Sequence, residues 1–262
     1  MEIALSPMEF SRRARRLYPD CEAVVDGDLR FTYAQFLERC NRWSSALQSL
    51  DVGQGDRVAY IAPNTHGHLE GYYAVPQIGA VMVPINFRLI PQDFEYIINH
   101  SGAKVVCVHS DLIEAVNSIR DQLVGVEHFV ALEGNAEGWI NYEETLAAQS
   151  PKFSAVTIKE TDLITINYIS FLITQNVDNL HQDSGVDEEK ISELHGNATY
   201  AKCLDCSKRY ELEILKREFI ETNEPPLCSI CGGILKTATI SFGQAMPERE
   251  MKISQHKAIE SD

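Results

Sequence analysis

Two Cys-x-x-Cys pairs, Cys203/Cys206 and Cys228/Cys231, lie within 29 residues of this 262-residue chain. Each pair can direct two thiolates at one metal ion from a tight turn, and two pairs complete a tetrahedral set of four ligands. The 21 residues between Cys206 and Cys228 are close to the spacing of paired zinc knuckles. The pattern predicts one structural zinc ion without an open coordination position, which supports folding and performs no catalysis.

Other kinds of cysteine chemistry are disfavoured by the rest of the sequence. No apolar signal-peptide core begins the chain, so disulfides are disfavoured and a cytoplasmic location is expected. A thioredoxin-like redox site needs a single pair at a helix start, and two pairs without that context argue against it. Cys21, Cys40 and Cys107 stand singly among apolar neighbours, which is typical of buried free thiols.

The composition is that of a globular protein with an acidic surface. The formal net charge of −15 repels nucleic acid unless a basic patch overrides it, and no such patch is evident. No apolar run approaches the roughly 18 residues needed to span a bilayer. The arginines between residues 12 and 16 are flanked by acidic residues and are interpreted as a solvated helix face. These features predict neither a nucleic-acid nor a membrane partner.

Residues 1–168 alternate between helix and strand patterns. Capping boxes at Ser6/Glu9 and Thr32/Gln35 predict two helix starts, and apolar residues spaced by four and three follow the second. Strands are expected at 22–26, 29–33, 57–62, 81–84 and 104–109, and further helices at about 66–77 and 91–101. The alternation predicts an α/β layer with largely parallel strands.

Six short motifs of this half occur in a characteristic order. They are Phe31-Thr32-Tyr33, Gly55-Asp56-Arg57-Val58, Ala62-Pro63-Asn64, Gly79-Ala80-Val81, Val83-Pro84-Ile85-Asn86 and His100-Ser101-Gly102-Ala103-Lys104. Together they closely resemble the N-terminal subdomain of AMP-forming acyl-CoA synthetases, the adenylate-forming family. The resemblance implies that residues 1–168 are a partial adenylate-forming domain.

The phosphate-binding loop of that family is missing from its expected place. The family activates a carboxylate with ATP and holds the phosphates with a Ser/Thr/Gly-rich loop, which is expected directly after Tyr168. Here residues 169–173 continue as an apolar strand, and β-branched residues cannot replace the backbone amides of a glycine-rich turn. We therefore carry over no catalytic residue from this family and interpret the half as an acyl-CoA synthetase fragment without synthetase activity.

Polar residues follow two short apolar stretches in residues 169–262. A buried strand is expected at 171–175, and Asn176 and Asp178 follow its carboxyl end, where α/β sheets usually bind ligands. The alternative is a turn in which these side chains bond to their own backbone. His195 follows the second stretch and can serve either as a general base or as a packing residue. Spacing alone leaves both alternatives open.

The motifs of this second half resemble another family. They are Thr174-Gln175-Asn176-Val177-Asp178-Asn179-Leu180-His181, Glu193-Leu194-His195-Gly196, the two Cys-x-x-Cys pairs and Ile240-Ser241-Phe242-Gly243. Their order resembles the central portion of a sirtuin, an NAD-dependent protein-lysine deacylase. The resemblance implies a partial sirtuin Rossmann-like core in residues 169–262, with a small four-cysteine zinc ribbon at about 199–236.

Carried over residue by residue, this resemblance implies NAD as cosubstrate and an acylated lysine peptide or protein as partner. Gln175, Asn176 and Asp178 would line the pocket for nicotinamide and its ribose. His195 would be the catalytic general base that deprotonates a ribose hydroxyl. The products would be free lysine, nicotinamide and O-acyl-ADP-ribose.

The acylated lysine is expected in a tunnel bordered by Ile240 and Phe242, with neighbouring backbone pairing with an extended peptide. Two parts of the family's NAD site have no counterpart in the sequence. They are the Gly-Ala-Gly-type pyrophosphate loop, expected before Ile169, and the strands beyond the helix that starts near Pro247. The NAD site is therefore expected to be incomplete, and a base without its phosphate cradle loses the positioning that catalysis requires.

Three interpretations of the whole chain follow. It is a working or residual NAD-dependent deacylase, a non-catalytic zinc-ribbon module that binds a peptide or protein, or a chimera of two gene fragments without a joint function. The motifs change family near Tyr168 without a Pro/Gly/Ser-rich linker, which favours the chimera. Each half lacks strands that its family's sheet uses, so open sheet edges and self-association are expected.

Overall fold

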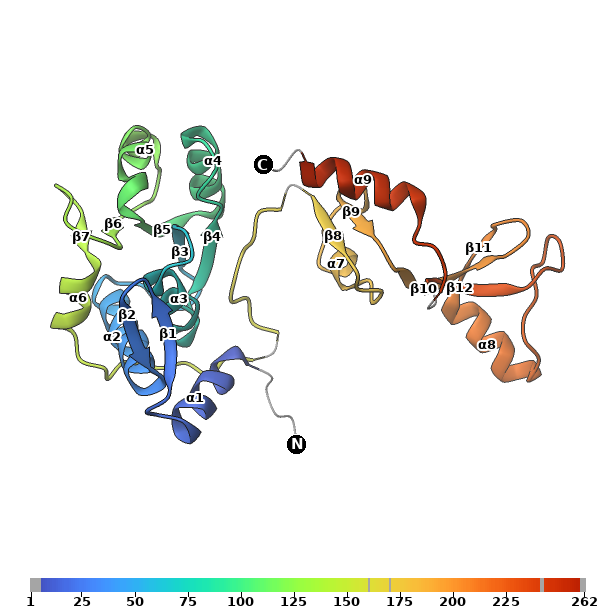
Figure 1. Cartoon of the computed structure of the whole chain (residues 1–262), viewed down its shortest axis with the longest axis horizontal. Helices are drawn as coiled ribbons and strands as arrows, with labels where there is room; N and C mark the ends of the chain where they lie inside the picture. Colours follow the sequence, from blue (N-terminus) through green and yellow to red (C-terminus); the bar gives the residue numbers. More distant parts are fainter. Residues whose placement is uncertain (1–5, 160, 170, 241–242, 260–262) are drawn as a thin grey trace. The chain divides into compact units, whose positions relative to one another are not determined.

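The computed structural model describes residues 6–159, 161–169, 171–240 and 243–259 of the chain. It divides into two compact units, Met1–Tyr168 and Ile169–Asp262, coloured blue to yellow and yellow to red in Figure 1. We call them unit 1 and unit 2 and describe each by itself. No helix among the described residues combines the length and the apolar character needed to cross a bilayer.

Unit 1 is an α/β unit in which strands and helices alternate, as the sequence predicts. Its helices are α1 (Pro7–Leu17), α2 (Tyr33–Ser49), α3 (His66–Ala74), α4 (Pro91–Ser101), α5 (Ile113–Asn117) and α6 (Tyr142–Ala148). Its strands are β1 (Glu22–Asp26), β2 (Leu29–Thr32), β3 (Arg57–Ile61), β4 (Val81–Ile85), β5 (Ala103–Val108), β6 (His128–Ala131) and β7 (Ile140–Asn141). Strands β1 and β2 form an antiparallel hairpin apart from the main sheet.

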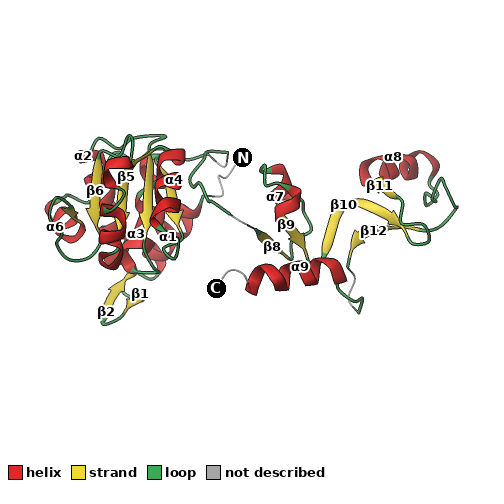
Figure 2. Ribbon diagram, turned by 90° about the horizontal axis from the view of Figure 1, so that it is seen from above, coloured by secondary structure: helices red, strands yellow, loops and turns green. Residues whose placement is uncertain are grey.

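The main sheet of unit 1 is parallel throughout and has the strand order β4-β3-β5-β6-β7. Successive side chains of β3 enter different cores, because strand residues alternate between the two faces of a sheet. Val58 and Tyr60 pack with α2, α3 and α6, whereas Ala59 and Ile61 pack with α4 and α5. Figure 2 accordingly shows helices on both sides of this sheet. The predicted fold class, α/β with largely parallel strands, is confirmed.

The helix starts in unit 1 confirm one predicted capping box and correct the other. Thr32 and Gln35 form the complete box at the start of α2. Ser6 caps α1, but its hydroxyl accepts from the backbone N–H of Met8, and the Glu9 carboxylate pairs with Arg12 one turn further on. The predicted box at Ser6/Glu9 is therefore wrong, because a nearby guanidinium competes for the glutamate.

Two further details of unit 1 differ from the sequence prediction. The helix expected over 66–77 ends as an α-helix at Ala74 and continues as a 3-10 turn over Pro76–Ile78. Proline has no N–H to continue the α-helical hydrogen bonds, which explains the change. Cys40 and Cys107 are buried as expected, but Cys21 is exposed, because it lies in the loop before β1.

Unit 2 is smaller and contains two separate sheets. Its helices are α7 (Leu180–Asp183), α8 (Leu212–Thr222) and α9 (Glu248–Ile259), and its strands are β8 (Leu172–Thr174), β9 (Ile191–Glu193), β10 (Gly196–Cys203), β11 (Arg209–Glu211) and β12 (Leu235–Thr239). Strands β8 and β9 form a two-stranded parallel sheet. The other sheet is antiparallel with the order β11-β10-β12 and carries the cysteine pairs at its end.

Candidate functional site

The polar residues singled out in the sequence meet at one end of the small parallel sheet of unit 2. Because β8 and β9 are parallel, their carboxyl ends lie side by side. Gln175, Asn176 and Asp178 follow β8, and His195 lies in the two-residue turn between β9 and β10. Two backbone hydrogen bonds join these loops: Leu194 N–H donates to the Thr174 carbonyl at 2.9 Å and Ala198 N–H donates to the Val177 carbonyl at 2.8 Å.

The third predicted segment reaches the same place. The backbone N–H of Ile240, directly after β12, donates to the His195 carbonyl at 2.9 Å. Ile240 is half-buried. Phe242, the other residue predicted to contact the acylated lysine, lies outside the described residues. Three segments that are up to 65 residues apart in sequence, from Gln175 to Ile240, are thus tied together around the His195 turn.

The side chains at this meeting point are open to solvent. Gln175, Asn176 and Asp178 are exposed, and His195 is half-buried. Their amide, carboxylate and imidazole groups can exchange hydrogen bonds with the carboxamide and hydroxyl groups of a ligand. The chemistry that this arrangement allows is recognition of a polar ligand beside a potential general base.

Asn197 is a structural residue of the site that sequence reasoning missed. Its side chain is 2% exposed. Its amide nitrogen donates to Asn179 Oδ1 at 2.9 Å and to Glu193 Oε1 at 2.8 Å, and its oxygen accepts from the Thr199 backbone N–H and hydroxyl. It therefore connects the loop after β8 with β9 and β10. Its position two residues after His195 was the only sequence feature that pointed to it. The hydrogen bond to Asn179 could not be predicted, because the two residues are 18 positions apart.

A polar cavity of about 510 Å³ lies beside this region of unit 2. Its lining includes Asn179, Glu193, Asn197 and Ile240, whereas Gln175, Asn176, Asp178 and His195 are not part of it. The residues predicted to contact nicotinamide therefore line the open end of the sheet, not this cavity. The cavity and the predicted cosubstrate residues are connected through the hydrogen-bonded residues Asn179, Glu193 and Asn197, which line the cavity.

Gly196, directly after His195, is expected to be essential for the packing of β10 against β12. Its φ is +73°, and a Cβ atom there would lie 1.9 Å from the Ala238 carbonyl oxygen. We expect Gly196→Ala to destabilise unit 2 by about 3 kcal/mol, because both the left-handed conformation and the backbone clash oppose the methyl group. Thermal denaturation followed by circular dichroism measures this loss.

The matched control for this prediction is Gly185→Ala. Gly185 also has a positive φ, +91°, but no atom lies within 4 Å of a Cβ added there. The control should cost only the conformational part, about 1 kcal/mol. Equal effects of the two substitutions would contradict the close approach of β12 to Gly196.

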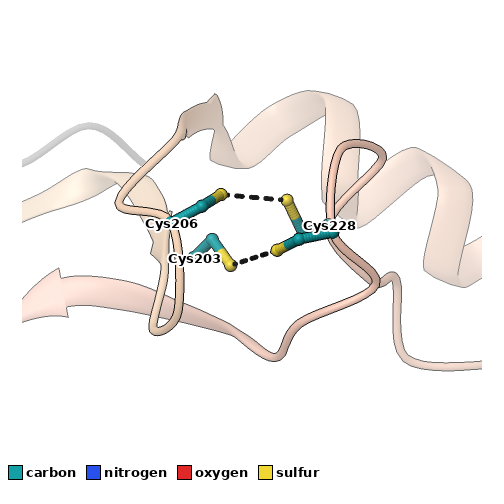
Figure 3. Close-up of side chains that lie close together, drawn as sticks. Cys203, Cys206 and Cys228 are labelled. Atoms are coloured by element: carbon teal, nitrogen blue, oxygen red, sulfur yellow. Dashed lines mark hydrogen bonds between the residues drawn. The ribbon is translucent and has the colours of Figure 1, made fainter.

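The four paired cysteines converge in space. Their sulfur atoms all lie within 4.8 Å of one another, with 3.4 Å between Cys203 and Cys231 and 3.5 Å between Cys206 and Cys228. Figure 3 shows the sulfur atoms facing one another from the two knuckles. A tetrahedral zinc ion with Zn–S bonds of about 2.3 Å holds its sulfurs roughly 3.8 Å apart, so the four thiols fit this ion.

Tyr210 is the second residue that sequence reasoning missed. Its phenol oxygen lies 3.2 Å from Cys228 Sγ, and the hydrogen bond between them is the largest of the contacts that lower the pKa of Cys228 to about 6, together with backbone hydrogen bonds within the second knuckle. A thiol with a lowered pKa is more readily available as the thiolate that a metal requires. No cysteine spacing points to this tyrosine, because β11 brings it to the knuckle only after folding.

Comparison with known proteins identifies unit 1. The model of the AMP-binding enzyme family matches residues 10–170, which is more than half of the chain. A long-chain-fatty-acid–CoA ligase from Thermus thermophilus is 39% identical over 155 residues, covering 57% of this chain and 29% of the ligase. An anthranilate CoA ligase solved in complex with anthranoyl-AMP superposes with a TM-score of 0.62 at 25% identity, covering 65% of this chain and 33% of that chain.

The same comparison identifies the remainder. The model of the Sir2 family matches residues 117–262, again more than half of the chain. The NAD-dependent protein deacetylase 1 of Bradyrhizobium diazoefficiens is 42% identical over 137 residues, covering 51% of this chain and 53% of the deacetylase. The two family matches overlap over residues 117–170, whereas the two structural units meet between Tyr168 and Ile169.

The two sets of relatives are each matched in part. The chain spans about three tenths of the ligase and about half of the deacetylase. Its parallel sheet and its ligase-like motifs agree with the first family, and its sirtuin motifs agree with the second. The chain belongs both to the AMP-binding enzyme family and to the Sir2 family, as a chimera of two partial domains.

Proposed function

We propose that residues 169–262 act as a sirtuin-type NAD-dependent protein-lysine deacylase whose fold is stabilised by a structural zinc ion. The observation that carries the proposal is the meeting of three segments: the loop after β8, the His195 turn and the chain directly after β12. Membership of the Sir2 family and the similarity to a protein deacetylase support it.

His195 is the proposed general base. The hydrogen bonds from Ile240 N–H to the His195 carbonyl and from Leu194 N–H to the Thr174 carbonyl fix the backbone of its turn beside the end of β8, and its side chain is half-buried. A neutral imidazole can take a proton from a ligand hydroxyl and hold it near neutral pH. NAD, when bound, supplies the ribose carbon that accepts the acyl oxygen and the hydroxyl that loses its proton.

Gln175, Asn176 and Asp178 are the proposed contacts to nicotinamide and its ribose. Their exposed amide and carboxylate groups match the hydrogen-bonding groups of a carboxamide and a diol. Ile240 and Phe242 are the proposed neighbours of the acylated lysine. The four paired cysteines are the proposed zinc ligands, and the ion has no role in the reaction because it has no open position.

Replacement of the proposed base tests this function. Zinc-loaded chain is incubated with NAD and an acetyl-lysine peptide, and released nicotinamide is measured by chromatography. We expect His195→Ala to reduce the rate of release by at least about 100-fold, since general base catalysis typically contributes a factor of 10² to 10⁴. The variant should keep its zinc and its circular dichroism spectrum.

His256→Ala is the matched control, because His256 is exposed and lies on α9 of the same unit. Its rate should equal that of the unaltered chain. Release that persists in His195→Ala would contradict the assignment of the base. An absence of release from the zinc-loaded unaltered chain would contradict the deacylase proposal as a whole.

A second candidate is a non-catalytic zinc-ribbon module that binds a peptide. The polar cavity favours it, because this space of about 510 Å³ is separate from the residues assigned to NAD. In that case calorimetry would detect binding of the acetyl-lysine peptide in the absence of NAD, together with bound zinc and no turnover. Unit 1 is proposed as a scaffold, and no ligase activity is assigned to it.

A further inference from the structure

The phenol oxygen of Tyr210 makes three contacts with the second cysteine knuckle. It lies 3.2 Å from Cys228 Sγ, 2.9 Å from Ser229 Oγ, and it accepts a hydrogen bond of 3.0 Å from the Ser229 backbone N–H. Tyr210 itself belongs to β11, where it pairs with Ala201 of β10. Strand β10 ends at Cys203, so the tyrosine connects the sheet that carries the first knuckle to the second knuckle.

The hydrogens at this junction can be assigned by elimination. A thiolate bound to a metal has no hydrogen and can only accept, so the single phenol hydrogen of Tyr210 must point to Cys228 Sγ. The oxygen then accepts from the Ser229 N–H and from the Ser229 hydroxyl, which uses both of its lone pairs. With the metal-bound thiolate as acceptor, all three contacts of the phenol oxygen are satisfied at once.

The hydroxyl of Tyr210 can also stabilise the negative charge of the cysteine thiolates. Four thiolates around one Zn²⁺ carry a net charge of −2, and the chain is already strongly acidic. Cys228 is 3% exposed, so water can solvate its share of that charge only weakly. In the described part of unit 2, Tyr210 is the one hydroxyl side chain hydrogen-bonded to any of the four sulfurs.

We propose that Tyr210 is a positioning residue of the metal site, donating to the Cys228 thiolate and thereby slowing loss of the ion. The proposal rests on the zinc site assigned above and is independent of deacylase activity. It requires no contact between Tyr210 and the metal. The hydrogen bond holds the second knuckle against the sheet and disperses negative charge from the sulfur.

The rate of zinc loss tests the proposal in the full chain. Each variant is loaded with one equivalent of zinc, and transfer to an excess of a colorimetric chelator is followed in time. We expect Tyr210→Phe to release zinc about 10-fold faster, in line with the effect of removing outer hydrogen-bond partners of metal ligands. Ser229→Ala should have a smaller effect, because its backbone N–H still orients the phenol.

Tyr200→Phe is the matched control within the same sheet. Tyr200 lies on β10 with its ring 4.0 Å from the Arg209 guanidinium carbon, and that ring is retained in the variant. Its zinc release should equal that of the unaltered chain. Equal release rates for Tyr210→Phe and the unaltered chain would overturn the proposal.

A spectroscopic signature separates this role from general destabilisation. In the Co²⁺-loaded chain, loss of a hydrogen bond raises the energy of the sulfur lone pairs, so the thiolate-to-cobalt charge-transfer band should move to longer wavelength in Tyr210→Phe alone. A band that stays in place while zinc release accelerates would overturn the proposed hydrogen bond. Neither measurement uses NAD or a peptide, so failure of the deacylase proposal would leave both results interpretable.

Discussion

Removal of zinc is expected to unfold the ribbon at about 199–236 while unit 1 stays folded. Binding of structural zinc contributes roughly 10–16 kcal/mol to the folding of small zinc-finger peptides at neutral pH. Replacing one ligand, as in Cys228→Ser, should have nearly the same effect as a strong chelator, because three thiolates hold the ion much less tightly than four. No other change in the chain is expected to have a larger effect on stability.

The reason for the large effect is the small apolar core of the ribbon. Buried apolar side chains there are few: Ala201, Leu215 and two of the cysteines themselves. In contrast, Ile220 is 70% exposed and Ile230 is 67% exposed. A segment of about 40 residues with so little buried apolar surface is not stable without a crosslink or a metal.

The positions of the tryptophans allow unit 1 to be monitored separately from the ribbon. Trp43 and Trp139 are the two tryptophans of the chain, and both belong to unit 1. Their fluorescence should be unchanged by chelation, whereas amide hydrogen exchange over 199–236 should lose its protection. Cys21→Ser is the control, since Cys21 is exposed and lies outside the cluster. Protection that survives complete zinc removal would contradict a metal-dependent ribbon.

The sequence was most informative where the signal is local. The Thr32/Gln35 capping box, the α4 helix ending before Gly102 and the alternation of strands with helices depend on neighbouring residues, and the structure confirms them. The Ser6/Glu9 box failed because an arginine one turn away competes for the glutamate. Local patterns predict an element well unless a side chain of opposite charge lies within reach.

The sequence was less informative about contacts between distant segments. The spacing of the cysteine pairs predicted that four sulfurs would converge, and they do. It could not predict that Tyr210 would reach Cys228, because that contact depends on the pairing of β11 with β10. The buried ion pairs of unit 1 were missed for the same reason: Arg39 and Glu70 are 31 residues apart and meet only when α2 packs on α3.

Removal of Arg39 is expected to destabilise unit 1 by about 3–5 kcal/mol, the second largest effect in the chain. The Glu70 side chain is completely buried and accepts from Arg39 at 2.5 Å and from the Tyr142 hydroxyl at 2.5 Å. Arg39 also binds Glu143, which in turn lies 3.1 Å from His66. Arg39→Met keeps most of the apolar stem but leaves the Glu70 carboxylate buried without its cation.

The pH dependence of this loss identifies its cause. Burial raises the pKa of Glu70, and the hydrogen bond from Arg39 opposes that rise. Without Arg39, the pKa in the folded state should lie further above the pKa in the unfolded state. The folded variant then binds a proton more tightly than the unfolded one, so its stability is retained below the unfolded pKa and is lost as pH rises through the folded pKa. The difference in unfolding free energy between Arg39→Met and the unaltered chain should therefore become smaller as the pH is lowered toward 4.

Urea unfolding followed by tryptophan fluorescence measures both effects, since the fluorescence reports on unit 1. Arg42→Met is the matched control on α2, because Arg42 pairs with the partly exposed Glu38 and should cost about 1 kcal/mol or less. Adding Glu70→Gln to Arg39→Met should restore most of the lost stability, since the amide is uncharged and can still accept from Tyr142. If the double variant were no more stable than Arg39→Met alone, an unpaired buried carboxylate could not be the cause, and the lost packing of the Arg39 stem would have to account for the effect.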